Sequence, residues 1–498
     1  MHVIVTKDKL AGSRVASRFF THKIAHGNAK GDNTTLGLAT GSSPIQLYDI
    51  LRSQKHLSFR NVTTFNLDEY EGLGPDDEDS YAFFMHKHLF NYIDINPENI
   101  NLLDGLTTDY ETMCNDYERK LRETCIDIQL LGIGHNGHIA FNEPVEEENY
   151  EVSLSLKTHR VKLSESTLEA NAQYLSRLVT HAYTMGIGSI LSAKQIVLLA
   201  WGERKGDVLN RALFGNEKLP VSCLGGHLNA KVIVDREAAS QIDLGARLKT
   251  CVNASSLFTG ERSDRSESDC QTVLIFSPHP DDDVIAMGAT ISKLVALNHR
   301  VVCVYQTSGS FGVKGVSRMA AKEIRRREAK HACSQLGVDE CAFLDCDFYE
   351  RSSGPEKLPI GELDIQVHVD CLDEYMPDVV FCAGDFSDPH GTHEKCTQAL
   401  FAALEQSRAK PSEVWLYKGA WEEWGLDEVS LVVPFEKDTL VQKNISILLH
   451  ESQTDTAYKG EDNRPFYVRA KERCEAQAKE YNALCGTTHQ FIEIFAAA

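Results

Sequence analysis

Short apolar runs recur along this chain, and helix-like patterns lie between them. In the first half these runs span 35–39, 62–65, 126–133 and 196–200. In the second half they span 272–276, 301–305 and 379–382. Strand-length apolar segments that alternate with helical patterns are typical of parallel strands joined by crossover helices. The sequence therefore predicts the α/β class.

The length of the chain, 498 residues, exceeds what one hydrophobic core usually organises. A segment at 254–270 is rich in Ser, Asp, Glu and Arg and poor in apolar residues, which is typical of a linker. We therefore expect two Rossmann-like domains, 1–253 and 271–498, each with a mostly parallel sheet flanked by helices.

The charge balance is acidic, with 51 Lys and Arg against 72 Asp and Glu and a net charge of −21. This argues against nucleic acid or an anionic membrane as the main partner, and any phosphate must be held by local donors. The sequence contains neither a long apolar run nor a secretory leader pattern, so we expect a cytoplasmic protein that does not enter membranes. A homo-oligomer is compatible with this composition.

Polar clusters follow the expected strands of the first half. One cluster follows the run at 35–39 and would place backbone N–H groups and hydroxyls at a helix N-terminus. It consists of Thr40, Gly41, Ser42 and Ser43. This pattern favours an anion cradle, although such turns also simply cap helices. Lys205 follows another expected strand and could add a cation, or it could be an ordinary solvated lysine.

Acid/base candidates follow two further strands. Asp68 lies in an expected strand-end loop, where it could be a general base or only a capping carboxylate. His138 and Glu143 lie in one glycine-rich turn, in which a carboxylate can orient an imidazole.

The first domain resembles the glucosamine-6-phosphate deaminase family over nearly its whole length. The matching strings are LGLATGSSPIQLY, VTTFNLDEYEGL, SYAFFMHKHLF, ENINLLDG and LLGIGHNGHIAFNEP. The resemblance implies that Asp68 moves a proton between C2 and C1 of the open-chain sugar. It implies that His138, oriented by Glu143 and with Asn136 in the same relay, opens the ring.

The same resemblance implies that the cradle from Thr40 to Ser43, together with Lys205, holds the phosphate. It implies no cofactor in this domain. Position 173 is Gln, where the family often has an Arg that grips the substrate, and a neutral amide does not replace a bidentate cation.

A second constellation follows the expected strands at 272–276 and 379–382. His279 and Asp282 come after the first of these strands, and His393 opens a helix after the second. Two imidazoles and a carboxylate with open positions suit catalytic Zn²⁺ or another divalent ion. Asp281 could then act as a base, and His390 could stabilise an oxyanion or protonate an amine.

The second domain resembles the LmbE-like (PIG-L) zinc-dependent N-acetylglucosamine deacetylases. The matching strings are SPHPDDDVIAMGATISKL, DPHGTH and HESQ, together with a helix that begins RRRE. The resemblance implies His279, Asp282 and His393 as metal ligands, Asp281 as base and His390 as acid. It also implies that Arg325 contacts the substrate.

Together the two domains predict a bifunctional enzyme with a small phosphosugar as substrate. The second domain would deacetylate N-acetylglucosamine 6-phosphate or a related N-acetyl amino sugar. The first would convert glucosamine 6-phosphate to fructose 6-phosphate and ammonia. One alternative is a deacetylase with a phosphosugar-binding regulatory domain, which Gln173 motivates. Another is a biosynthetic deacetylase of a nucleotide- or lipid-linked amino sugar.

Overall fold

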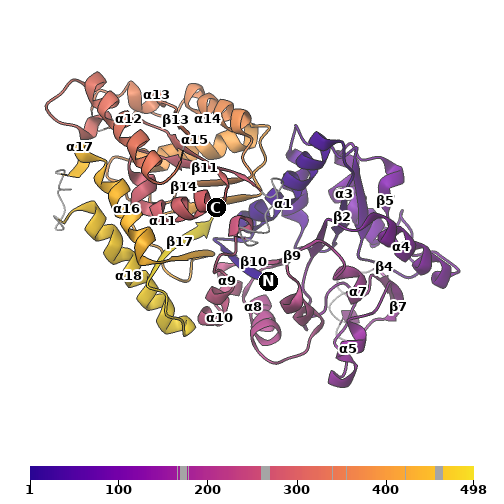
Figure 1. Cartoon of the computed structure of the whole chain (residues 1–498). Coiled ribbons are helices and arrows are strands. Elements are labelled where there is room, and N and C mark those ends of the chain that lie inside the picture. Colours follow the sequence, from indigo (N-terminus) through magenta and orange to yellow (C-terminus); the bar gives the residue numbers. More distant parts are fainter. Residues whose placement is uncertain are drawn as a thin grey trace. The chain divides into compact units, whose positions relative to one another are not determined.

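The computed structural model describes residues 1–164, 167–168, 176–177, 179–258, 270–338, 340–354, 356–420, 422–454 and 464–498. They form two compact units, Met1–Thr250 and Cys251–Ala498 (Figure 1). In the described part of the chain, no helix combines the length and the apolar character that crossing a membrane requires.

The predicted linker falls largely on 259–269, and the position expected to carry a substrate-gripping Arg is Gln173; both lie outside the described residues. The start of the predicted linker belongs to the second unit, because Leu257 is buried in the core of that unit. The second unit also takes in Cys251 to Asn253, and the backbone N–H of Asn253 donates to Val432 O at 2.9 Å. The second unit therefore starts earlier in the chain than the sequence predicts.

The first unit is built on a seven-stranded sheet in which every pairing is parallel. In spatial order its strands are β1 (His2–Thr6), β10 (Ala230–Asp235), β9 (Gln195–Ala200), β6 (Ile128–Leu131), β2 (Thr34–Leu38), β3 (Val62–Asn66) and β5 (Ile100–Asn101). Its α-helices are α1 (Lys9–Lys30), α2 (Ile45–Ser53), α3 (Tyr81–His88), α4 (Tyr110–Thr124), α5 (Tyr150–Ser153), α7 (Ile187–Ile190), α8 (Glu203–Leu209), α9 (Arg236–Ala239) and α10 (Leu244–Lys249).

A small antiparallel sheet accompanies this unit. Its strands, in spatial order, are β4 (Asp68–Tyr70), β8 (His181–Thr184) and β7 (His159–Lys162). The prediction that Asp68 lies in a loop is therefore wrong, because its backbone pairs with Thr184. The sequence signal is weak here, since three residues are too few to show an alternating pattern.

The second unit has a seven-stranded mixed sheet. In spatial order its strands are β13 (Glu340–Phe343), β12 (Arg300–Tyr305), β11 (Thr272–Ser277), β14 (Val379–Ala383), β15 (Glu413–Tyr417), β17 (Phe491–Ala497) and β16 (Leu431–Phe435). The strands from β13 to β15 are parallel, and the last two join antiparallel. Its α-helices are α11 (Asp282–Ala296), α12 (Arg318–Gln335), α13 (Asp347–Glu350), α14 (Glu362–Tyr375), α15 (Thr392–Gln406), α16 (Lys437–Leu448), α17 (Glu451–Thr454) and α18 (Phe466–Cys485).

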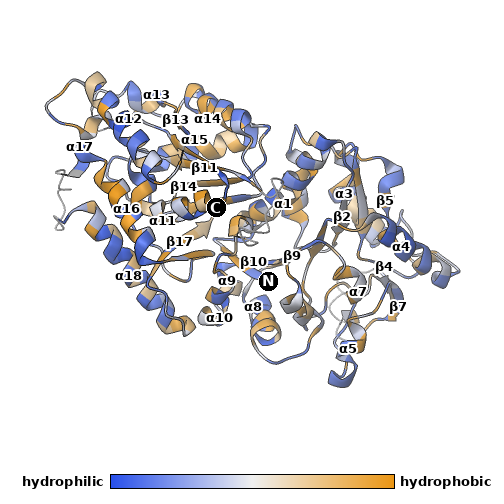
Figure 2. Ribbon diagram, viewed as in Figure 1, coloured by the Kyte–Doolittle hydropathy of each residue, from blue (hydrophilic) through white to orange (hydrophobic). Residues whose placement is uncertain are grey.

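Both faces of this sheet are covered, so the interiors of its central strands β11 and β14 are apolar. Val273 and Ile275 of β11 pack into one core with side chains of α11, α12, α16 and α18. Leu274 and Phe276 point the other way, into a core shared with α14 and α15. The helices lie on the two sides of β11 and β14 in Figure 1, and Figure 2 shows the hydrophobic strands between them. The predicted fold class of mostly parallel sheets flanked by helices is confirmed.

Helix α11 changes direction at Met287, whose φ of −139° and ψ of 24° are not helical. Beyond the kink, Glu493 of β17 accepts the N–H groups of Ala289 at 3.1 Å and of Thr290 at 2.7 Å. It thus caps the second part of the helix. Lys443 of α16 donates to the same carboxylate at 2.6 Å, and both partners of this ion pair are buried.

We expect the Glu493→Gln substitution to lower the free energy of unfolding of the second unit by about 3–5 kcal/mol, because Lys443 would remain buried without its counter-ion. Urea unfolding followed by tryptophan fluorescence measures this, in a Trp201→Phe background that removes the tryptophan of the first unit from the signal. Glu480→Gln, which changes an exposed carboxylate on α18, is the matched control and should cost less than about 0.5 kcal/mol. Equal, small losses in the two variants would contradict the role of the buried pair.

Candidate active sites

Three neighbouring strands of the first unit, β2, β6 and β9, end in loops that are bonded to one another. Trp201, just after β9, donates its indole N–H to Ser43 O in the loop after β2, at 3.2 Å. Lys205 donates to Ile133 O in the loop after β6, at 2.6 Å. In an open parallel sheet the ligand site lies at this edge of the strands.

The predicted anion cradle lies between β2 and α2. Gly41 has a φ of +89°, a conformation that glycine adopts without strain, and Gly41 and Ser42 are exposed. Thr40 and Ser43 are partly buried. Burial lowers the pKa of Lys205, whose ammonium lies at the loop after β6. The cradle therefore has the exposed backbone that an anion requires. The hydrogen bond from Trp201 to Ser43 connects it to the segment between β9 and Lys205.

Asp68 is buried in the small sheet. Burial raises its pKa well above the ordinary value, and the adjacent carboxylate of Glu69 adds to this shift. Tyr70 and Tyr81, whose hydroxyls lie 3.1 Å apart, are close enough for the charge of Asp68 to raise their own pKa values. A carboxylate in such a setting is a stronger base than a solvated one.

The carboxylate of Glu69 has a structural role. Its carboxylate accepts the backbone N–H groups of Tyr70 at 2.8 Å, of Tyr81 at 3.0 Å and of Ala82 at 2.8 Å, so it caps the start of α3. Burial raises its pKa to about 7 against these hydrogen bonds. Of the two adjacent carboxylates, Asp68 is therefore the one that suits proton transfer.

His138 lies in the loop after β6, with its Nδ1 3.7 Å from Glu143 Oε2. Glu143 also accepts hydrogen bonds from Thr167 and, at 2.8 Å, from Asn136. Burial opposes its ionisation, but the nearby His138 and the hydrogen bonds from Thr167 and Asn136 lower its pKa to about 2. A Cβ on Gly134 would come within 2.4 Å of the His138 ring, so only glycine leaves room for the imidazole there. The structure thus brings three of the predicted residues, Asn136, His138 and Glu143, together.

In the second unit the structure also brings the predicted metal ligands together. One possible ligand atom from each of His279, Asp282 and His393 lies within 4.8 Å of the others. Asp282 Oδ2 is 3.1 Å from His279 Nδ1 and 3.2 Å from His393 Nε2. His393 Nε2 is buried and makes no hydrogen bond with the described residues. Two imidazoles and one carboxylate with an unbonded buried nitrogen fit Zn²⁺ or a similar divalent ion.

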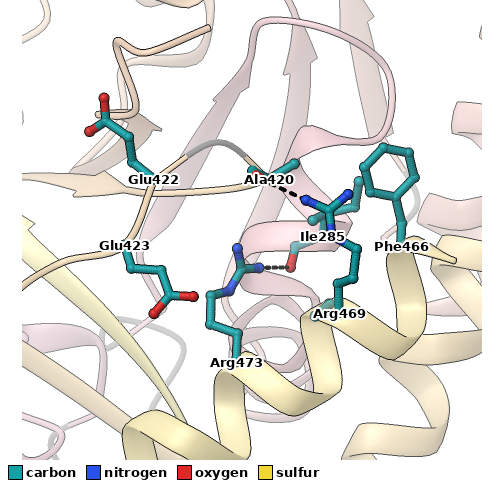
Figure 3. A pocket seen from close by; sticks show the side chains of 8 residues that line it. Ile285, Ala420, Glu422, Glu423, Phe466, Arg469 and Arg473 are labelled. Atoms are coloured by element: carbon teal, nitrogen blue, oxygen red, sulfur yellow. Dashed lines mark hydrogen bonds between the residues drawn. The ribbon is translucent and has the colours of Figure 1, made fainter. Parts of the chain in front are cut away.

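Asp385, which sequence reasoning missed, orients His393. Its Oδ1 lies 2.7 Å from His393 Nδ1, and its Oδ2 accepts the N–H of Gly419 at 3.0 Å. A carboxylate on Nδ1 fixes the tautomer that leaves the Nε2 lone pair for a metal. Gly419 is held in turn by Arg473 of α18, which also donates to Ile285 O at 3.0 Å (Figure 3). In the sequence, the only indication of a role for Asp385 is that it is a polar residue just after an expected strand.

Asp281, the predicted base, immediately precedes α11 with a φ of +145°. Non-glycine residues rarely adopt this conformation, so the surrounding structure must impose it. Arg325 holds it with two contacts, at 3.3 and 3.2 Å. Burial raises the pKa of Asp281 and the charge of Arg325 opposes that shift. The predicted substrate contact of Arg325 remains a prediction, because its side chain is only 2% exposed and pairs with Asp281.

His390, the predicted acid, is placed differently from the other members of its cluster. Its ring is exposed, and its backbone N–H donates to Asp388 at 3.1 Å. Another imidazole, that of His450, is buried near Asp281. Sequence reasoning noted His450 only as part of a matching string, and nothing in the string distinguishes a buried ring from an exposed one.

Comparisons with known proteins agree with the two units. Residues 7–233 match the family described as glucosamine-6-phosphate isomerases/6-phosphogluconolactonase, and residues 274–404 match GlcNAc-PI de-N-acetylase. A protein of Bacteroides thetaiotaomicron described as glucosamine-6-phosphate deaminase-like is 30% identical over 592 aligned positions, which cover 92% of this chain and 88% of the relative.

Two further relatives match the first half alone. A Thermoanaerobacter glucosamine-6-phosphate deaminase is 41% identical over 251 residues, which cover 49% of this chain and 95% of the relative. A solved monomeric glucosamine-6-phosphate deaminase is 40% identical, covers 48% of this chain and 100% of its own, and has a TM-score of 0.45. This chain belongs to the glucosamine-6-phosphate isomerase/6-phosphogluconolactonase family and carries a second domain of the GlcNAc-PI de-N-acetylase family. Both resemblances predicted from the sequence are confirmed.

We expect the Asp385→Asn substitution to weaken metal binding by about 10–100-fold. The Asn oxygen would still accept the Gly419 N–H, so its NH₂ would face His393 and favour the tautomer with hydrogen on Nε2. Competition with a chromophoric chelator measures the affinity. Asp370→Asn, which changes an exposed carboxylate on α14, should leave the affinity unchanged. Wild-type affinity in Asp385→Asn would mean that the carboxylate does not set the tautomer.

Proposed function

We propose that the chain is a bifunctional amino-sugar enzyme that acts on one metabolite in two steps. The second unit deacetylates N-acetylglucosamine 6-phosphate, and the first unit converts the resulting glucosamine 6-phosphate to fructose 6-phosphate and ammonia. The observation that carries the proposal is the presence in one chain of two groups of reactive side chains, each at the carboxyl ends of parallel strands. The names of the relatives support glucosamine 6-phosphate as the substrate of the first unit.

The chemistry of the second unit is amide hydrolysis, in which water and the acetamide give acetate and the free amine. His279, Asp282 and His393 would hold the divalent ion, and we assign zinc on the basis of this ligand set. The bound ion would supply Lewis acidity that polarises the amide carbonyl and the water. Asp281 takes the proton from the attacking water, and Arg325 keeps its carboxylate pointed at the site.

In the first unit, His138 moves the proton that opens the sugar ring, while ionised Glu143 keeps the imidazole oriented. Asp68 takes the proton from C2 of the open-chain sugar and returns it to C1. The amine carbon is thereby converted to an imine, and water hydrolyses this imine to the ketone and ammonia. Lys205 and the cradle formed by Thr40, Gly41, Ser42 and Ser43 hold the phosphate.

Phosphorylated sugars are cytoplasmic metabolites, so we place the enzyme in the cytoplasm. The deciding experiment supplies N-acetylglucosamine 6-phosphate and measures acetate and ammonia together. Equal amounts of both products are expected at completion. Acetate without ammonia, even when glucosamine 6-phosphate is supplied, would indicate a regulatory first unit. Faster acetate release from a nucleotide- or lipid-linked donor would indicate a biosynthetic deacetylase.

We expect Asp68→Asn to slow ammonia release by at least about a hundredfold, because an amide cannot take the C2 proton. Acetate release should remain at the wild-type rate, so that glucosamine 6-phosphate accumulates and can be measured by chromatography. Asp76→Asn, an exposed change in the same unit, is the control. Retained ammonia release in Asp68→Asn would remove this carboxylate from the mechanism.

We expect His279→Ala to abolish acetate release and to lower the bound metal, since one of three ligands is lost. Ammonia release from glucosamine 6-phosphate should be unchanged. His331→Ala, which removes an exposed imidazole on α12, should affect neither activity. Full acetate release by metal-free protein would refute metal-dependent hydrolysis.

A further inference from the structure

A small cavity lies beside Asp281 in the second unit. Most of its wall is apolar and comes from three helices: Ile285 of α11, Leu448 of α16, and Phe466 and Tyr467 of α18. The cavity has a volume of about 20 Å³. Its size is therefore that of one water molecule or one methyl group.

His450 contributes to this wall and is the most unusual polar group in it. The side chain is 1% exposed, and neither ring nitrogen has a hydrogen-bond partner among the described residues. Burial lowers its pKa to about 3, and the nearby Arg325 cation adds to this shift, so the ring is neutral and carries one N–H donor. Leaving a buried donor and acceptor unbonded costs about 1–3 kcal/mol, and such groups in native proteins usually have a functional reason.

The position of this ring is fixed by the segment that follows it. Ser452 donates its backbone N–H and its hydroxyl to Glu328 of α12, both at 2.7 Å. His450 is therefore held between the end of α16 and a point anchored to the helix that also carries Arg325. Both nitrogens of this buried ring remain without a hydrogen-bond partner among the described residues, so a small bound group could bond to one of them.

An acetyl group combines the two features that this cavity accommodates: a methyl group and a hydrogen-bond-accepting oxygen. We infer that the cavity is the acyl-binding subsite of the second unit, with the apolar wall around the acyl methyl group and His450 donating a hydrogen bond to the acyl oxygen. The inference rests on the proposed deacetylase function and adds a catalytic residue and a limit on acyl length. Asp281 lines the same cavity, so the base lies next to the acyl carbon that water attacks.

A larger neighbouring cavity supports this orientation of the substrate. Its volume is about 200 Å³, and Ile285 and Phe466 line both cavities (Figure 3). Its other walls carry Arg473 of α18 and Glu423, and charged groups of both signs beside an aromatic ring suit the hydroxyls and the face of a sugar. An N-acyl sugar could thus lie with its polar ring on one side of Ile285 and its acyl group on the other.

The test of the acyl limit compares N-acetyl and N-propionyl glucosamine 6-phosphate as substrates for wild type and Leu448→Ala. Leu448 is 43% exposed, so its truncation enlarges the cavity with little risk to folding. One methylene that does not fit typically costs about 10–200-fold in kcat/KM, so we expect at least a tenfold wild-type preference for acetyl. Leu448→Ala should reduce this preference about tenfold, whereas Ile445→Ala, an exposed change on the same helix, should not.

An unchanged acyl preference in Leu448→Ala would overturn the subsite while leaving the deacetylase function intact. The function itself fails if wild type releases acetate neither from the 6-phosphate nor from nucleotide- or lipid-linked N-acetylglucosamine, and the subsite then fails with it. These two failures are therefore distinguishable.

The test of His450 uses His450→Ala and the donor-retaining His450→Asn. We expect His450→Ala to lower kcat at least about tenfold, with bound metal at the wild-type level, and His450→Asn to recover part of the loss. Loss of metal from His450→Ala would make His450 a ligand rather than a donor to the substrate. Unchanged kcat/KM for the acetyl substrate would also overturn the assignment.

Discussion

The burial of both faces of a parallel sheet determines where this protein can place its reactive groups. Strand β11 of the second unit sends alternate side chains into two separate cores, so its interior carries no charged residue. The candidate reactive groups of this sheet instead follow the ends of its parallel strands, and these ends lie at one edge. His279 follows β11 and Asp385 follows β14, which is its neighbour in the sheet. Residues more than a hundred positions apart in the chain thus meet without any local sequence signal.

Hydrogen bonds to backbone groups at this edge fix the positions of the candidate metal ligands. Arg473 bonds both the first turns of α11 and Gly419, and Gly419 bonds the carboxylate that fixes the His393 tautomer. The ligand set thereby depends on α18, which supplies none of the ligands. Glu493 performs a comparable task further along α11, where it replaces helix hydrogen bonds lost at the kink. In both places a charged side chain, partly buried in Arg473 and buried in Glu493, bonds backbone groups that the fold leaves without regular partners.

The sequence predicted the fold class and the clustering of most candidate residues, because strand periodicity and residues at strand ends are local properties. It did not predict that Asp68 lies in a strand, since the pairing with β8 comes from a distant segment. It did not connect Arg325 with Asp281, or Glu328 with Ser452, although all four residues lie in or beside the strings that carried the resemblance. A string shows which residues are present, whereas the partner of each one depends on how helices pack. For the same reason the exposure of His390 and the burial of His450 could not be read from the sequence.

The presence of two units on one polypeptide has a consequence for the cell. Each unit has its own sheet and its own buried core, so damage to one need not alter the geometry of the other. Quality-control proteases, however, degrade a chain once any part of it exposes unfolded backbone. A decrease of about 1–2 kcal/mol in the free energy of unfolding can therefore change the abundance of a protein several-fold. An inherited change that unfolds the second unit would therefore also remove the intact first unit from the cell. Genetic phenotypes of such alleles would report the abundance of the whole chain rather than the chemistry of the mutated half.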